Sequence, residues 1–282
     1  MPGILYVVAT PIGNLEDITL RALRVLKEVD LIAAEDTRIT RKLLSHYGIH
    51  TPLTSCHRHT REAKITTLAA RLAAGENIAL VCDAGTPAIS DPGADLIARA
   101  IAQGSPVVAI PGPSAVLAAL VSSGLPTGRF TFEGFPPRTK SDRRAFFAHL
   151  RNEARTVVLF ESPGRLLQTL EDIYAVLGDR PISVARELTK QFEEVYRGTV
   201  SGAIAHYRSN KPRGEFTLVL GPEHSTAPED TSSGPTSLQQ ALQAALEAGA
   251  TPRDAVAHVA DGLGLPRRLV YRTLLELQNK AR

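Results

Sequence analysis

The chain has 282 residues, of which 43% are hydrophobic and 5% are aromatic, and it contains no Trp. This length exceeds one typical domain, and a core of Val, Leu, Ile and Ala favours α/β layers. The formal net charge of +3 is too small to indicate a polyanionic partner by itself. Only Cys56 and Cys82 are present, and their spacing indicates neither a metal site nor a disulfide framework.

The N-terminus, MPGILYVVATP, lacks a basic segment, and its apolar run is short. It therefore has the features of neither a signal peptide nor a membrane span. We expect both cysteines to be free thiols in a reducing compartment. These features predict a cytoplasmic protein without a membrane partner.

The first part of the chain alternates predicted strands and helices. Apolar runs at residues 4–9 and 31–34 predict strands, and each is followed by a helical pattern. The second strand ends at Glu35-Asp36-Thr37-Arg38. Two adjacent carboxylates at a strand end could face a ligand. The chemistry of Asp36 favours capping of the next helix, since Asp is a good N-cap.

The stretch 78–93, IALVCDAGTPAISDPG, is where we expect a ligand. Its apolar start predicts a buried strand, and the carboxyl ends of parallel strands face the binding crevice of an open α/β sheet. Gly85 and Gly93 allow close approach of the backbone to a ligand. An ordinary strand-to-helix connection remains the alternative for this stretch alone.

Another predicted strand, residues 106–110, ends in Pro-Gly-Pro before Ser114 and a helix of small residues. Ser114 can cap that helix or present its hydroxyl to a ligand. The pattern changes after residue 125, so we predict a first α/β lobe at 1–125. A second α/β lobe is predicted at 126–221, where strands end at Glu161 and before Glu187.

Two basic stretches, 138–144 (RTKSDRR) and 208–213 (RSNKPR), lie in the second lobe. The simpler interpretation of the first is a solvated loop, but a mobile basic arm beside a cleft would supply phosphate contacts. Residues 222–236 have the composition of a flexible linker. Residues 237–282 predict three helices, at 238–248, 251–262 and 266–278, which resemble a helix-turn-helix module. Such a small core favours docking on a partner or a second subunit.

Five segments together are similar to the tetrapyrrole-methylase superfamily of S-adenosylmethionine-dependent methyltransferases. Within it, they resemble the enzymes that methylate ribosomal RNA. They are LYVVATPIGNLEDITLRA, AEDTR, VCDAGTPAISDPG, AIPGPSA and ARELTKQFEEVYRG. The resemblance runs in order from Leu5 to the C-terminal helices. The combination is far more specific than a single Gly-rich loop, although Cys82 stands where the family often has Ser.

This resemblance implies two α/β lobes with S-adenosylmethionine in the cleft between them, a small C-terminal helical module, and a homodimer. It also implies a set of cofactor-binding residues from both lobes. From the first lobe these are Pro11, Asp83, Ala84, Gly85, Thr86, Ser114 and Ala115, and from the second they are Phe160, Leu188 and the segment from Gly214 to Thr217.

The reaction that the resemblance implies is methylation of the ribose 2′-hydroxyl of a cytidine in small-subunit ribosomal RNA, free or in the assembled subunit. A ribose hydroxyl is a weak nucleophile, so it must be held in line and lose its proton. The candidate catalytic residues are Glu35 and Asp36, with Arg38 as partner of the carboxylate or of a phosphate, and Lys190 as an alternative base. Glu161 and Glu187 also lie at predicted strand ends that face the cleft, and the sequence leaves the choice of base open.

Two rival functions remain. The same loops would serve methylation of a small tetrapyrrole or another metabolite, and a helix-turn-helix could belong to a non-catalytic nucleic-acid-binding regulator. The basic stretches and the helical module are not needed for a small substrate. A regulator would leave the cleft-lining loops of both lobes unexplained.

Overall fold

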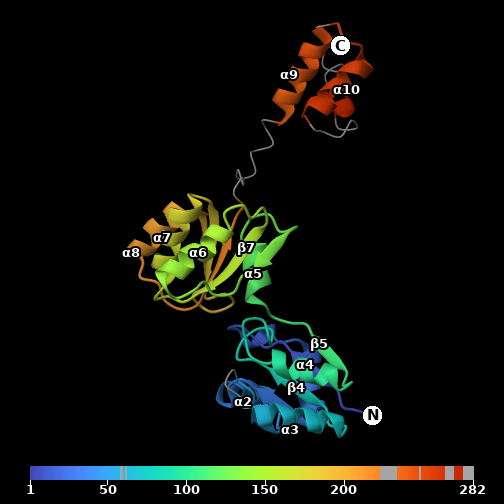
Figure 1. The fold of residues 1–282 in the computed structure, drawn as a ribbon, viewed down its shortest axis with the longest axis vertical. Coiled ribbons are helices and arrows are strands. Elements are labelled where there is room, and N and C mark those ends of the chain that lie inside the picture. Colours follow the sequence, from blue (N-terminus) through green and yellow to red (C-terminus); the bar gives the residue numbers. More distant parts are fainter. Residues whose placement is uncertain (58–59, 61, 223–233, 248, 264–269, 276–282) are drawn as a thin grey trace. The chain divides into compact units, whose positions relative to one another are not determined.

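The computed structural model describes residues 1–57, 60, 62–222, 234–247, 249–263 and 270–275. The chain divides into two compact units, Met1–His224 and Ser225–Arg282. The first unit carries two β-sheets with helices, and the second is helical (Figure 1). The α/β fold that the sequence predicts is confirmed in the first unit.

The first sheet is formed, within the described residues, by five parallel strands in the order β3-β2-β4-β1-β5. Alternate residues of each strand face opposite layers: Ile32 packs with α1 and α2, whereas Leu31 packs with α3 and α4. Both faces are therefore covered, as a parallel sheet requires. The elements are β1 (Leu5–Val8), η1 (Leu15–Asp17), α1 (Leu20–Glu28), β2 (Leu31–Ala34), α2 (Thr37–His46), β3 (Leu53–Ser55), α3 (Glu62–Ala73), β4 (Ile78–Val81), α4 (Ala94–Ala102) and β5 (Val107–Ile110).

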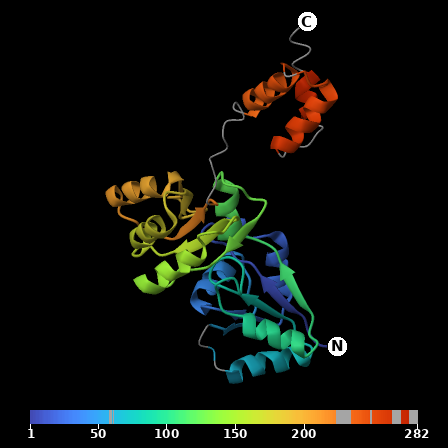
Figure 2. The ribbon, with the colours of Figure 1, turned by 45° about the horizontal axis from the view of Figure 1, so that its top comes forward.

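The second sheet has, among the described residues, five strands in the order β6-β7-β10-β8-β9. Only β6 and β7 pair in parallel, and the other pairs are antiparallel. Helices α6, α7 and α8 cover one face (Figures 1 and 2). The elements are β6 (Phe130–Phe132), α6 (Lys140–His149), β7 (Thr156–Glu161), α7 (Leu166–Leu177), β8 (Pro181–Arg186), β9 (Glu194–Thr199), α8 (Val200–Ser209) and β10 (Phe216–Leu220).

Helix α5 (Ala115–Ser122) covers the other face of the second sheet, where it packs against β7, β8 and β10. From the sequence we instead predict this helix in the first lobe, with the boundary after residue 125. By packing, the break between the lobes falls in the Pro-Gly-Pro loop at 111–113. The helix is apolar on most of its surface, so its sequence pattern does not indicate which sheet it covers.

The basic stretch 138–144 is not a mobile arm. Helix α6 begins at Lys140, and Arg143 is only 2% exposed. The Arg143 guanidinium donates to Asp172 Oδ2 at 2.7 and 2.9 Å, and Arg144 Nε donates to Asp172 Oδ1 at 2.7 Å. The charge pattern of the stretch does not indicate that Arg143 and Arg144 pair with Asp172, because Asp172 lies in α7, far along the chain.

The C-terminal unit contains α9 (Gly234–Glu247), α10 (Pro252–Leu263) and helical residues 270–275. Its apolar core includes Leu242, Val256 and Val270. Helix α9 begins inside the stretch 222–236 that the sequence assigns to a linker, and residues 223–233 lie outside the described residues. The predicted third helix, 266–278, is described only at 270–275.

Among the described residues, no helix is both long enough and apolar enough to cross a bilayer. The same part of the chain holds no group of three or more His, Cys, Asp or Glu side chains arranged to bind a metal ion.

The buried charge of Asp172 predicts a large stability effect. Asp172→Ala leaves Arg143 buried without its counterion, so we expect the free energy of unfolding in urea to fall by about 3–5 kcal/mol. Glu171→Ala is the matched control, because Glu171 pairs with Arg208 on the surface and should cost less than about 1 kcal/mol. Equal effects of the two substitutions would contradict this account.

The same ion pairs set a pH dependence. Burial raises the pKa of Asp172, but hydrogen bonds from Arg144 and Arg143 outweigh burial and hold the pKa below its ordinary value of 3.8. The stabilisation is therefore complete above that ordinary value and is lost as the pH falls through the lower, folded-state pKa. Wild type should lose its stability advantage over Asp172→Ala in this acid range.

Candidate functional site

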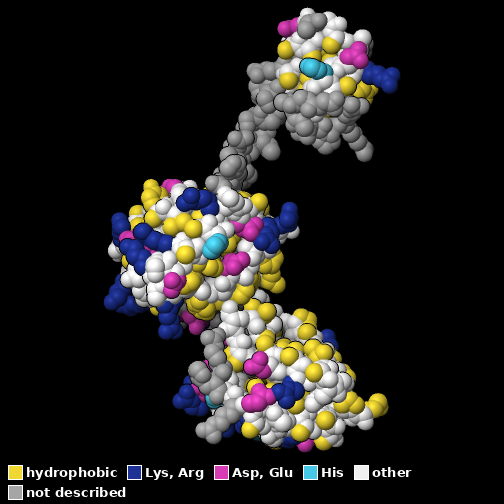
Figure 3. Space-filling view, viewed as in Figure 1, with side chains coloured by type: hydrophobic (Ala, Val, Ile, Leu, Met, Phe, Trp, Pro, Cys, Tyr) yellow, Lys and Arg dark blue, Asp and Glu magenta, His cyan; other side chains and the backbone are white. Residues whose placement is uncertain are grey.

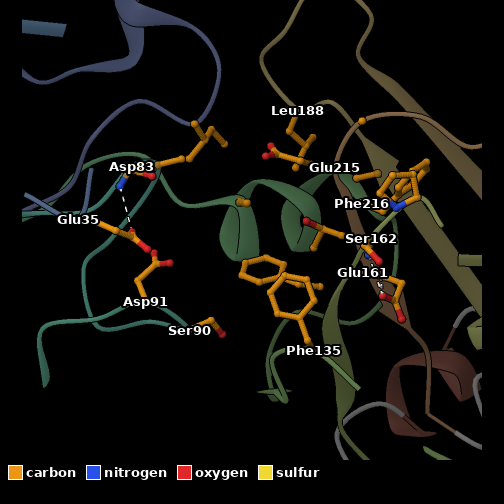
Figure 4. Close-up of a pocket in the computed structure, with 18 residues that line it drawn as sticks. Glu35, Asp83, Ser90, Asp91, Phe135, Glu161, Ser162, Leu188, Glu215 and Phe216 are labelled. Atoms are coloured by element: carbon orange, nitrogen blue, oxygen red, sulfur yellow. Dashed lines mark hydrogen bonds between the residues drawn. The ribbon is translucent and has the colours of Figure 1, made fainter. Parts of the chain in front are cut away.

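A pocket of about 420 Å³ lies between the two lobes of the first unit (Figure 4). Its walls combine carboxylates from the first lobe with mainly apolar side chains from the second. The lining residues are Ile12, Glu35, Asp83, Ala84, Ser90, Asp91, Ala115, Phe135, Phe160, Glu161, Ser162, Pro163, Ala185, Leu188, Gly214, Glu215, Phe216 and Thr217.

The first-lobe wall is built from the carboxyl ends of neighbouring strands β2 and β4. Asp83 Oδ1, after β4, accepts a hydrogen bond from the Asp36 backbone N–H at 3.0 Å. In return, the Asp83 backbone N–H donates to Glu35 Oε2 at 3.4 Å. The two loops therefore fix each other, and both carboxylates stay at the edge of the sheet that borders the pocket.

Glu35 and Asp36 have separate tasks. Glu35 lines the pocket, whereas Asp36 is the N-cap of α2 and accepts from the Arg38 backbone N–H at 2.8 Å, which confirms the predicted cap. The side chain of Arg38 also binds the Asp36 carboxylate at 2.6 Å, and these hydrogen bonds lower the pKa of Asp36 to about 2. The Asp36 carboxylate is therefore engaged by the helix cap and by the Arg38 side chain.

Asp83 is in a different electrostatic environment. Burial raises the pKa of its carboxyl above the ordinary value, and the charge of Asp36 adds to the rise, while the hydrogen bond from the Asp36 N–H opposes it. A partly buried carboxylate beside another carboxylate is unfavourable unless a cation or a donor joins it. This environment is typical of a ligand-binding residue.

The second-lobe wall is held by backbone conformations that side chains rarely adopt. Leu188 lines the pocket between Glu187 and Thr189, whose φ angles are +51° and +65°. Such left-handed conformations are costly for residues other than glycine and tend to occur at functional sites. Leu188 shares an apolar cluster with Ile12 of the first lobe, so the strained turn also joins the two walls.

Gly214 is required by close packing. Its φ is +84°, and a Cβ atom there would lie 2.4 Å from the Glu187 carboxylate. That carboxylate accepts from the Glu215 backbone N–H at 3.0 Å and from Lys190 Nζ at 2.8 Å. The absence of a side chain at Gly214 therefore lets the segment 214–217 lie against the strained turn.

Lys190 does not line the pocket. Its ammonium donates to Glu187 and to Glu215, at 2.8 and 2.9 Å. Burial lowers the pKa of Lys190, but these two hydrogen bonds outweigh it and the pKa lies above its ordinary value of 10.5. A catalytic lysine would need a lowered pKa, so this arrangement opposes the lysine alternative.

The structure brings about half of the sequence-predicted site residues into the pocket. Gly85 instead pairs with Thr10 in an isolated bridge, and Ser114 caps α5. The predicted residues that line the pocket are Glu35, Asp83, Ala84, Ala115, Phe160, Leu188, Gly214 and Thr217. Those that do not are Pro11, Asp36, Arg38, Gly85, Thr86, Ser114 and Lys190.

Several lining residues were missed by the sequence analysis. Ser90 and Asp91 lie within the stretch 78–93 already expected to bind a ligand, so the turn chemistry of that loop could have indicated them. Ala185 lies in a buried strand, where sequence does not distinguish a pocket wall from ordinary core. The others missed are Ile12, Phe135, Ser162 and Pro163, whereas Glu215 and Phe216 lie within the predicted segment from Gly214 to Thr217.

Solved methyltransferases share the fold of the first unit. A cobalt precorrin-4 methyltransferase shares it with a TM-score of 0.57 at 20% identity, over 77% of this chain and 94% of that one. A uroporphyrin-III C-methyltransferase from Thermus thermophilus has a TM-score of 0.55 at 22% identity, over 78% of this chain and 95% of that one. At these identities the likeness shows the fold.

The family profile described as Tetrapyrrole (Corrin/Porphyrin) Methylases matches residues 4–204, and the chain belongs to this family. Relatives named Ribosomal RNA small subunit methyltransferase I are similar over more of the chain. The one from Synechocystis sp. is 49% identical over 98% of this chain and 99% of its own. The one from Thermotoga maritima is 50% identical over 77% of this chain and 98% of its own. The family and the two-lobed fold that the sequence predicts are confirmed.

The environment of Asp83 predicts a separation of binding from stability. Asp83→Asn keeps an acceptor for the Asp36 N–H but removes the charge, so we expect affinity for S-adenosylmethionine to fall about 10- to 150-fold. The melting temperature should stay the same or rise, because the raised pKa shows that folding disfavours the charged carboxylate. Calorimetry and thermal unfolding measure the two effects.

Asp36→Asn is the matched control, since Asn is also a good N-cap and Asp36 does not line the pocket. It should leave cofactor affinity within about twofold of wild type. Unchanged affinity in Asp83→Asn would show that Asp83 only organises the loops.

Proposed function

We propose that this methyltransferase transfers the methyl group of S-adenosylmethionine to the ribose 2′-hydroxyl of a cytidine in small-subunit ribosomal RNA. The observation that carries the proposal is the similarity, over nearly the whole chain, to relatives named for that RNA. The solved tetrapyrrole-type methyltransferases share the fold at only 20–22% identity. This difference favours RNA over a tetrapyrrole as substrate.

The residues of the pocket fit S-adenosylmethionine. Its volume of about 420 Å³ lies in the range of small-molecule sites. Asp83 offers a charge-bearing acceptor for an ammonium or ribose hydroxyls, and Phe160 and Leu188 offer an apolar slot for adenine. The predicted cofactor-binding residues that line the pocket are proposed to hold it.

Glu35 is proposed as the residue that removes the proton from the ribose hydroxyl. The bound cofactor supplies an activated methyl group on a sulfonium, so the chain must orient the hydroxyl and accept its proton. Asp36 is engaged in the cap of α2. Glu161 also lines the pocket, but its side chain is fully buried and accepts from Thr169, Ser162 and Arg165. Of these three carboxylates, Glu35 is therefore the one that we assign as the base.

A homodimer is proposed as the working form. Leu117 and Val121 lie four residues apart on α5, on one face of the helix, and are 52% and 73% exposed. An apolar helix face of this kind is suited to a second copy of the chain.

Action on ribosomal RNA also accords with the proposed cytoplasmic location.

The C-terminal unit is proposed to bind RNA or the ribosomal subunit rather than to take part in the chemistry. The Thermotoga maritima relative aligns over 218 residues and 98% of its length, close to the extent of the first unit alone. A relative of the same name therefore has about the length of the two lobes alone. In the described helical residues 270–275, Tyr271 and Arg272 are exposed.

Single-turnover rates at saturating cofactor and RNA test the choice of base. We expect Glu35→Gln to slow methyl transfer about 10²- to 10⁴-fold, the usual contribution of a general base. Asp36→Asn and Lys190→Met should keep most of the wild-type rate. A dead Lys190→Met together with an active Glu35→Gln would contradict the assignment.

Truncation after Gly221 tests the proposed role of the C-terminal unit. The truncated enzyme should bind S-adenosylmethionine with unchanged affinity, because the residues that line the pocket end at Thr217. It should methylate small subunits with a raised KM. Full activity of the truncated enzyme would rule out this role.

The substrate itself is tested by nuclease digestion and mass spectrometry of ribosomal RNA from a strain that lacks this protein. One 2′-O-methylcytidine should be missing from the small-subunit RNA and return on complementation with wild type. An unchanged modification pattern would contradict the proposed function.

A further inference from the structure

Phe135 is an aromatic side chain at the mouth of the pocket. It lines the pocket and is 54% exposed. Its ring lies 5.5 Å from that of Phe160, centroid to centroid, and Phe160 in turn packs on Phe132 at 4.9 Å. An exposed Phe that packs on one ring, which is itself supported by a second, leaves part of its own ring open to a ligand.

The backbone around Phe135 is held by half-buried Arg165, which pairs with buried Glu161. Arg165 donates to the carbonyl oxygens of Pro136 and Pro137, at 2.5 and 3.3 Å. The same guanidinium binds Glu161 at 3.2 Å, and that carboxylate also accepts from Thr169 Oγ1 at 2.5 Å. Because these partners are buried or half-buried, the segment that carries Phe135 is rigid.

A second arginine, which is buried, holds the other end of the segment. Arg143 donates to the Arg138 carbonyl oxygen at 3.1 Å, while its remaining donors bind Asp172. Residues 135–138 are therefore fixed from both sides, although the side chains of Phe135 and Arg138 are exposed. A fixed segment that exposes an aromatic ring and a cation is preorganised for a ligand that has both a base and a phosphate.

The first lobe forms the acidic wall of the same pocket. Figure 4 shows Glu35 and Asp91 on one side of the pocket and the ring of Phe135 on the other. Ser90 comes close to the Phe135 segment, since a Cβ on Gly134 would lie 3.2 Å from Ser90 Oγ. Phe135 thus lies opposite the carboxylate that we propose as the base.

A ribose that reaches Glu35 must belong to a nucleotide whose base has left its stack. Unstacked bases are held by proteins mainly through stacking on aromatic side chains, beside cations that contact the backbone. In Figure 3, Lys and Arg side chains are more frequent on the visible face of the second lobe, which carries Phe135, than on that of the first.

We propose that Phe135 is the stacking platform for the base of the target nucleotide and that Arg138 contacts an adjacent phosphate. This inference rests on the proposed RNA methylation. It assigns substrate recognition to the second lobe at the pocket mouth, and it separates Phe135 from the residues that hold the cofactor.

The test uses the full-length enzyme and small ribosomal subunits purified from a strain that lacks it. Phe135→Ala should lower kcat/KM for these subunits roughly 5- to 150-fold, which corresponds to the loss of one base stacked on an aromatic ring. Phe135→Trp should keep most of the wild-type kcat/KM, because Trp also offers a ring for stacking. The affinity for S-adenosylmethionine, measured by calorimetry, should fall much less than kcat/KM, because Phe135 contacts the proposed adenine slot only through Phe160. Tyr174→Ala is the matched control, because Tyr174 is 47% exposed on α7 and does not line the pocket.

Binding of the same subunits at several salt concentrations gives an independent measurement. Arg138→Ala should reduce the slope of log affinity against log salt by about 1, since one phosphate contact is lost. Phe135→Ala should weaken binding without a change in slope.

Three results would overturn the inference. They are wild-type kcat/KM in Phe135→Ala, a fall in cofactor affinity that matches the fall in activity, and equal losses in Tyr174→Ala. Failure of the wild-type enzyme to methylate the subunits would instead contradict the proposed function, so the two failures are distinguishable.

Discussion

The mutual hydrogen bonding of two adjacent strand ends is the constraint on which the site depends. Because β2 and β4 run parallel, their carboxyl ends meet at one edge, and the loops after them are joined through Asp83 and the backbone of Asp36. This joining brings Glu35, Asp36 and Asp83 together. The structure relieves the repulsion by pairing Asp36 with Arg38, which leaves Glu35 and Asp83, of these three, to line the pocket. The resulting electrostatic cost is what makes this edge suited to a cationic or hydroxyl-rich ligand.

In the second lobe, which lies opposite this acidic edge, ion pairs hold the pocket wall rigid. Buried or half-buried pairs, Arg143 with Asp172 and Arg165 with Glu161, use their spare donors to hold backbone carbonyls rather than to bind solvent. A buried ion pair contributes little net stability compared with apolar packing, but it fixes geometry. In this lobe the polar interior therefore serves mainly to position the pocket wall.

The sequence predicted the strands and loops well where a local pattern decides the structure. The apolar runs of β2 and β4 and the turn residues after them indicated the first-lobe wall, including Glu35 and Asp83. Interactions between distant segments were not predictable in this way. The burial of Arg143 depends on Asp172, and the packing of α5 depends on which sheet offers an apolar face. Ala185 faces the pocket only because the two lobes meet there.

The position of β10 has a consequence for how the protein is made. This strand pairs with β7 on one side and β8 on the other, so the last strand of the first unit lies inside its sheet rather than at an edge. The second lobe cannot complete its core until residues 216–220 have left the ribosome, whereas the first sheet is complete once residue 110 has emerged. Since domains fold as units during synthesis, we expect the first lobe to fold first. Its acidic edge then stays exposed to solvent until the second lobe is complete. The pocket is therefore completed late in synthesis, because Gly214, Glu215, Phe216 and Thr217 are the last of its lining residues to be made.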